Sequence, residues 1–167
     1  MNKHGKLVRN EIPALIEAKG EACTWHTAAT DKEFSDKLGL KLLEEVSEFA
    51  SARTCEELAD ALEVINALIA LHGLDTAIQL DGYSTIRMFS ESDFEDKDLE
   101  YDLIMELDDL AMAFLTDSSR ERLVVLVRRL WEVAGFQGYE RDEVERVRLE
   151  KLKSHGGFDE RIILDES

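Results

Sequence analysis

Six acidic side chains form the pattern in this chain that is most able to do chemistry. They occur as EEVSE (44–48) and ELADALE (57–63). On one helix, Glu44 and Glu48 would be four residues apart, and Glu45 and Glu48 three apart. Like charges at these spacings destabilise a helix by roughly 0.2–0.5 kcal/mol per pair. A cation between two such helices would remove that cost, so the pattern favours a bound ion.

Glu57 and Asp60 repeat the three-residue spacing on what we expect to be the next helix. The apolar column that Asp60 heads continues with Val64, Ala67 and Leu71. Because no Lys or Arg occurs within 54–72, a carboxylate beside this apolar face lacks a local partner. Carboxylate oxygens without nearby His or Cys suit Mg²⁺ or Mn²⁺ better than zinc. We therefore expect a metal site, against the alternative of an ordinary solvated acidic face.

Composition limits the classes of protein to consider. The 167 residues suffice for one domain, 1–167, with charged residues at 34% and apolar residues at 44%. A net charge of −17 argues against nucleic acid or an anionic membrane as a partner. Neither a signal peptide nor a membrane-spanning segment is expected. Cys23 and Cys55 lack CxxC spacing and are expected to be reduced thiols of a cytoplasmic protein.

Helical periodicity and a single proline predict an all-α fold. Helices are expected at 11–19, 32–53, 55–72, 99–115, 118–134 and 140–154. Short extended segments are expected near the termini, one of them at 23–29, and a loop is expected at 81–98. We expect Asp31 to cap the second helix and Thr54 to cap the third, with Glu57 completing a capping box. Capping and metal binding would compete for the Glu57 side chain.

An internal repeat relates two helical hairpins. LLEEVSEFASA (42–52) aligns with LIMELDDLAMA (103–113), and INALIALHGL (65–74) with VRRLWEVAGF (127–136). In the second copy, the positions of Glu45, Glu48, Glu57 and Asp60 are taken by Glu106, Asp109, Ser119 and Arg122. Two hairpins that bury their apolar faces together make a four-helix bundle. We expect one complete acidic site and one degenerate copy.

Four motifs in a fixed order carry a family resemblance. They are KLVRNEIP (6–13), LLEEVSEF (42–49), EELADALEVI (56–65) and KLKSHGGFDERI (151–162). The chain resembles the MazG-like all-α nucleoside triphosphate pyrophosphohydrolases. It is most similar to their short branch, described as phosphoribosyl-ATP pyrophosphohydrolase-like or house-cleaning.

The resemblance covers 3–74 and 138–164, so the hairpin 42–74 carries the acidic site and 138–164 holds the last helix and the GGF motif. Residues 75–137, which contain the second hairpin, look inserted. The resemblance to short family members implies the helix pairing of a dimer. This chain is therefore expected to be a homodimer or a single-chain pseudo-dimer.

The resemblance implies Mg²⁺-dependent cleavage of the α–β phosphoanhydride of a nucleotide. The expected metal ligands are Glu45, Glu48, Glu57 and Asp60. Glu44 and Glu48 are the expected catalytic residues, Glu44 orienting or deprotonating the water or acting as a further ligand. Glu63 either supports this site or faces solvent.

The expected phosphate-binding residues are Lys6, Arg9, Lys151 and Arg161. The family's usual Arg and Lys beside GGF are replaced here by His155 and Glu160, which leaves Lys151 and Arg161 as the cations of that motif. Trp25 either stacks on a base or packs against the helices.

Two other functions share these features. Phosphoribosyl-ATP is an alternative substrate, although no second basic cluster for a ribosyl phosphate is evident. A helical module that binds a nucleotide–metal complex without cleaving it is the other alternative, and the degenerate copy agrees with it. The sequence does not identify the base.

Overall fold

Two consecutive helices carry the acidic residues in the computed structural model, which describes residues 5–84 and 89–166. Helix α2 spans Asp31–Ala52 and helix α3 spans Cys55–His72. Thr54 caps α3 as expected, its hydroxyl oxygen accepting the backbone N–H of Glu57 at 3.3 Å. Gly73 ends α3 in the left-handed region at φ 62°. The boundaries of this helix therefore follow from its local sequence.

The expected cap of α2 is wrong by one residue. Thr30 is the capping residue, because its extended backbone turns its hydroxyl oxygen toward the backbone N–H of Glu33, at 3.1 Å. Asp31 is instead the first residue of the helix. Either residue type caps a helix well, so adjacent Thr and Asp leave the start of a helix ambiguous by one position.

A short connection between α2 and α3 brings their acidic ends together. Arg53 adopts a left-handed conformation at φ 54°, and its backbone N–H donates to the carbonyl of Phe49. Its own carbonyl accepts the hydroxyl of Tyr139 at 2.8 Å. The chain therefore reverses within Arg53 and Thr54, which places the end of α2 beside the start of α3.

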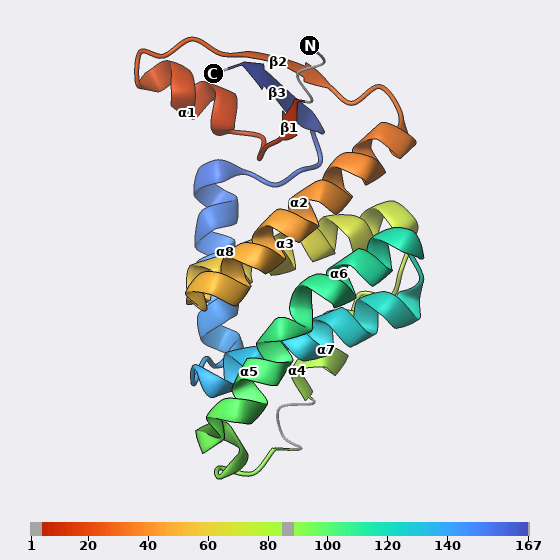
Figure 1. The fold of residues 1–167 in the computed structure, drawn as a ribbon. Coiled ribbons are helices and arrows are strands. Elements are labelled where there is room, and N and C mark those ends of the chain that lie inside the picture. Colours follow the sequence, from red (N-terminus) through yellow and green to blue (C-terminus); the bar gives the residue numbers. More distant parts are fainter. Residues whose placement is uncertain (1–4, 85–88, 167) are drawn as a thin grey trace.

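A small antiparallel sheet lies at one end of the helices (Figure 1). It contains β1 (Lys6–Leu7), β2 (Thr24–Thr27) and β3 (Ile162–Glu166) in the order β1-β3-β2. The central strand comes from the C-terminal tail, and the extended stretch expected at 23–29 contains β2. Helix α1 (Ile12–Ala18) connects β1 to β2 and has Pro13 in its first turn.

The rest of the chain is helical, with two departures from expectation. It forms α4 (Ala77–Ser84), a 3-10 turn at Asp93–Glu95, α5 (Lys97–Met105), α6 (Leu107–Thr116), α7 (Arg120–Phe136) and α8 (Arg141–His155). The prediction of a single helix at 99–115 is wrong, because the helix is interrupted at Glu106. Leu103 and Leu107 keep a four-residue spacing across the break, so periodicity does not reveal it. The loop expected at 81–98 is partly helical, and its residues 85–88 lie outside the described part.

The helices pack around one continuous apolar core. α2 lies against α3 and α6, α6 lies against α7, and α8 lies against α3. Fully buried side chains come from both halves of the chain, among them Leu42, Phe49, Leu58, Leu107 and Leu126. The protein is thus mostly helical, as the sequence predicts. Within the described ranges, no helix combines the length and apolar character needed to cross a membrane.

Candidate metal centre

Five carboxylates gather between α2 and α3. Oxygens of Glu44, Glu45 and Glu48 lie within 4.8 Å of one another, and so do oxygens of Glu45, Glu57 and Asp60. Glu45 belongs to both groups and connects them. The structure therefore brings together all four expected metal ligands and the additional catalytic candidate, Glu44.

Glu45 has the least satisfied carboxylate of the group. Its side chain is buried, and its Oε1 accepts a hydrogen bond from Lys41 Nζ at 2.6 Å. Its Oε2 is also buried and has no hydrogen-bond partner among the described residues. Burial raises the pKa of Glu45; Lys41 opposes this, and the carboxylates of Asp60 and Glu48 raise the pKa further. A buried polar atom left without a partner costs about 1–3 kcal/mol, which a cation at Oε2 would remove.

Glu48 and Glu57 meet where α2 ends and α3 begins. Loss of solvent contact raises the pKa of Glu48, and the neighbouring carboxylates of Glu57 and Glu44 raise it further. The hydrogen bond between the Glu48 and Glu57 side chains acts in the same direction. These two acids repel each other when both are ionised, unless a positive charge lies between them.

Basic side chains surround the acids. Lys6 Nζ lies 2.6 Å from Glu44, and Arg9 Nη2 lies 2.7 Å from Asp60. Lys151 also pairs with Asp60. Although partial burial opposes it, the hydrogen bond from Lys6 lowers the pKa of Glu44, with help from Lys41. Three of the four expected phosphate-binding residues, Lys6, Arg9 and Lys151, therefore lie beside the expected metal ligands.

Some of these groups line one cavity of about 490 Å³, whereas Glu44, Glu48 and Glu57 are not part of its lining. Its lining is formed by Glu45 and Asp60, by four basic side chains, by His155 and by the apolar residues Val8, Ile12 and Leu164. Sequence reasoning missed Lys41 and His155 as members of this cavity. Lys41 precedes Glu45 by four residues, a spacing that indicates an ion pair on one helix face. A cavity that combines carboxylates with cations suits a polyphosphate bound together with divalent ions.

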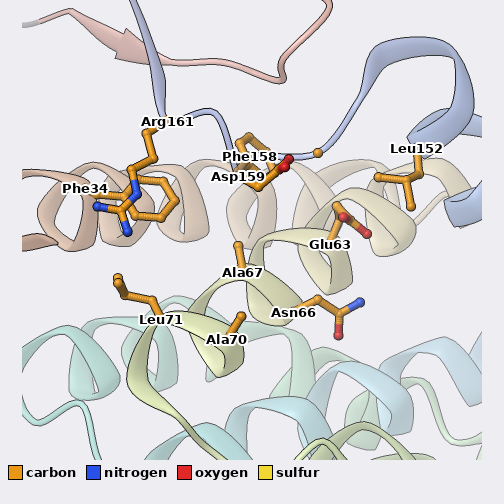
Figure 2. A pocket seen from close by; sticks show the side chains of 11 residues that line it. Phe34, Glu63, Asn66, Ala67, Ala70, Leu71, Leu152, Phe158, Asp159 and Arg161 are labelled. Atoms are coloured by element: carbon orange, nitrogen blue, oxygen red, sulfur yellow. The ribbon is translucent and has the colours of Figure 1, made fainter. Parts of the chain in front are cut away.

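Arg161 lies apart from the five clustered carboxylates. Its Nη1 donates to Asp31 at 2.6 Å, and its guanidinium lies 4.6 Å from the centre of the Phe34 ring. It lines a second cavity, which Figure 2 shows from close by. The structure therefore does not bring Arg161 together with the other three expected phosphate-binding residues.

The surroundings of Glu63 and Trp25 each disagree with one of the two alternatives expected for that residue. Glu63 is buried rather than solvent-facing, and it pairs with Arg148 of α8. It lines the same second cavity as Arg161. Trp25 is 48% exposed on β2, so it is not packed into the core.

The donor set fits Mg²⁺ or Mn²⁺. Every side chain in the two acidic groups offers a hard carboxylate oxygen, and neither group contains His or Cys. The unpartnered Oε2 of Glu45 is an additional acceptor directed into the protein. Asp60 is the exception, because Arg9 and Lys151 already occupy its two oxygens. A metal at Asp60 would share or displace these contacts.

Comparisons of the chain with protein-family models, with curated proteins and with solved structures found no match.

Proposed function

We propose that this chain is a Mg²⁺-dependent nucleoside triphosphate pyrophosphohydrolase of the MazG-like, house-cleaning kind. It would cleave the α–β phosphoanhydride to give a nucleoside monophosphate and pyrophosphate. The observation that carries the proposal is the buried Glu45, which joins two carboxylate groups and has an unpartnered inner oxygen. The cations beside it are those that a polyphosphate would need.

The proposed architecture is a four-helix bundle made of two hairpins, α2–α3 and α6–α7. The contacts of α2 with α6 and of α3 with α7 support this arrangement. In this proposal the second hairpin, within 75–137, takes the place that a second subunit has in short family members. The protein would then act in the cytoplasm as a single-chain pseudo-dimer or as a homodimer.

Glu45, Glu48, Glu57 and Asp60 would hold the metal. When bound, Mg²⁺ neutralises charge on the phosphate oxygens and acidifies a coordinated water. Glu45 and Asp60 pair with basic side chains, whereas Glu48 and Glu57 have no ion pair among the described residues, which supports binding of a divalent ion there. Burial raises the pKa of Glu45 and of Glu48, and neighbouring carboxylates raise both further.

The remaining side chains would position the substrate and move a proton. Lys6, Arg9 and Lys151 would donate hydrogen bonds to phosphate oxygens. The attacking water forms a bond to the α-phosphorus, and the α–β bridging oxygen leaves with pyrophosphate. Glu44 and Glu48 are the two candidates to accept the proton of the water.

The proposal is tested by pyrophosphate release from a nucleotide panel with Mg²⁺. Wild-type protein should release pyrophosphate from triphosphates, and Glu48→Gln should remove nearly all of this activity. Glu150→Gln is a matched control, because Glu150 is exposed on α8 and pairs only with Arg146 among the described residues. An unchanged rate in Glu48→Gln contradicts the assignment of the site. Release from phosphoribosyl-ATP alone, or from no nucleotide at all, contradicts the proposed activity.

A further inference from the structure

The second cavity has the composition of a site for a planar organic ring. It measures about 380 Å³ and lies between α3 and the segment that follows α8. Its apolar lining consists of Phe34, Ala67, Ala70, Leu71, Leu152 and Phe158. Figure 2 shows Ala67 and Leu71 on the side of α3 that faces Phe34, Phe158 and Arg161. Ligand cavities of a few hundred Å³ with a mainly apolar lining and a few polar groups are typical of small-molecule sites.

The small side chains of α3 leave a flat surface in this cavity. Ala67 and Ala70 occur at a three-residue spacing, so both present methyl groups where longer side chains would fill the space. At one end of the cavity, the Arg161 guanidinium lies over the ring of Phe34. A flat ring entering beside them would contact methyl groups and aromatic carbon, and guanidinium groups stack well on such rings.

Two carboxylates and one amide, those of Glu63, Asp159 and Asn66, provide the polar side-chain atoms at the other end of the cavity. Glu63 Oε2 accepts from Arg148, and Asp159 Oδ1 accepts from Asn10 Nδ2 at 2.6 Å. The second oxygen of each carboxylate, Glu63 Oε1 and Asp159 Oδ2, has no hydrogen bond among the described residues. The Asn66 carbonyl oxygen is already engaged by Gln79 at 3.1 Å, whereas its Nδ2 donates no hydrogen bond among the described residues. The two free carboxylate oxygens therefore favour a ligand edge that donates hydrogen bonds, and the Asn66 amide favours an acceptor beside that donor.

The second cavity lies next to the first cavity, the one lined by Glu45, Asp60 and four basic side chains. On α3, Asp60 lines the first and Glu63, less than one turn further, lines the second. On α8, the consecutive residues Lys151 and Leu152 are divided in the same way. The guanidinium of Arg9, which pairs with Asp60, lies 5.5 Å from the centre of the Phe158 ring. Arg9 and Phe158 thus form a shared wall between the two cavities.

We propose that the second cavity binds the nucleobase of the substrate and selects bases that carry an exocyclic amino group. This inference rests on the function proposed above, in which the polyphosphate lies in the first cavity. An amino group of cytosine, adenine or guanine donates to the free carboxylate oxygens of Glu63 and Asp159. Uracil and thymine turn a carbonyl oxygen toward those carboxylates, which leaves acceptors facing acceptors.

The direct test is calorimetric binding of cytidine and uridine, which carry no phosphate. The two nucleosides differ in the group at position 4, which is an amino group in cytidine and a carbonyl in uridine. Wild-type protein should bind cytidine at least about tenfold more tightly than uridine. Asp159→Asn should reduce this preference, because the amide can donate to the uridine carbonyl. Asp159 is exposed, so this variant is expected to fold.

A cavity-filling variant tests the location independently. Ala67→Leu should weaken cytidine binding by about tenfold, since the added methylenes occupy the space for the ring. Ala18→Leu is the matched control, because Ala18 is exposed at the end of α1 and lines neither cavity. Circular dichroism would establish that Ala67→Leu is folded. Equal binding of cytidine and uridine, or cytidine binding unaffected by Ala67→Leu, overturns the inference.

Kinetics separate this inference from the proposed function. If cytidine binds as described but no triphosphate is cleaved, the proposed activity fails and the base site stands. If triphosphates are cleaved but Ala67→Leu leaves KM for cytidine triphosphate unchanged, the base site fails and the activity stands.

Discussion

The hairpins α2–α3 and α6–α7 cap their second helices in the same way but carry different charges. Thr54 begins α3 and Ser119 begins α7, and each hydroxyl accepts a backbone N–H three residues later at 3.3 Å. In the second hairpin, Glu106 pairs with Arg129 and Asp109 is exposed. In the first, the carboxylates share one region and one inner oxygen is unpartnered. Hairpin geometry alone therefore does not create a charge cluster; the difference lies in which acids are neutralised locally.

The two helix caps also align differently from the sequence repeat, which placed Ser119 at the position of Glu57. With the two helix starts matched, Arg122 occupies the third helical position that Glu57 occupies in α3. A cation then lies where the first hairpin has a carboxylate. The second hairpin therefore lacks the repulsion between carboxylates that makes the first a candidate metal centre. We interpret the second hairpin as a packing partner.

The largest expected contrast between the hairpins is in stability without metal. Asp60→Asn should destabilise the protein by about 3 kcal/mol, because it breaks a buried contact and leaves Arg9 and Lys151 without their carboxylate. Asp109→Asn, at an exposed position of the second hairpin, should change stability by less than about 0.5 kcal/mol. Urea unfolding measures both. Similar losses in the two variants would contradict the contrast.

Added metal should stabilise the first hairpin selectively. At Mg²⁺ concentrations near 100 times Kd, a single site adds about 2.7 kcal/mol to stability, which raises Tm by roughly 5–11 °C. Glu57→Gln should reduce this shift strongly, whereas Glu106→Gln should leave it intact. Thermal unfolding with and without Mg²⁺ provides the measurement. An equal shift in both variants would place the ion elsewhere.

A smaller effect should appear in the pH dependence of the metal-free protein. The pKa of Glu48 is raised above its ordinary 4.5, so folding favours its protonated form. The stability that this provides is complete below pH 4.5 and is lost as pH rises through the folded-state pKa. Unfolding free energies of wild type and Glu48→Gln, compared from pH 4 to 8, should therefore diverge in favour of Glu48→Gln as pH rises. Parallel curves would show that Glu48 titrates normally.

The smallest effects should be equal in the two hairpins. Thr54→Ala and Ser119→Ala each remove a helix cap and should each cost about 1 kcal/mol of unfolding free energy. Chemical denaturation of both variants tests whether the two helix starts are equivalent. A loss confined to one variant would show that the two caps differ in energy despite their matching geometry.

Local signals predicted the parts of the fold that depend on neighbouring residues. Thr54 and Gly73 mark the ends of α3, and the β-favouring residues at 23–29 contain β2. The break at Glu106 was not predictable, because Leu103 and Leu107 keep a helical spacing across it. Short extended segments near the termini were expected, but the pairing of β1 with β3 was not, since two residues form a strand only when a distant segment lies beside them.

The candidate site shows the same division between local and distant contacts. Helical spacing predicted that the carboxylates of one helix would lie together, and the short connection brought the two sets into contact. The places of Arg161 and Glu63 depend on Asp31 and Arg148, which are far away in the chain. A charge pattern along the chain does not identify such partners.

The most direct test of the account is Mn²⁺ binding followed by electron paramagnetic resonance. Wild-type protein and Glu106→Gln should bind the ion saturably below millimolar concentration, and Glu45→Gln should bind it at least about 100-fold more weakly. Binding that survives in Glu45→Gln, or no binding by the wild type at millimolar Mn²⁺, would contradict the claim that the carboxylates between α2 and α3 form a metal centre.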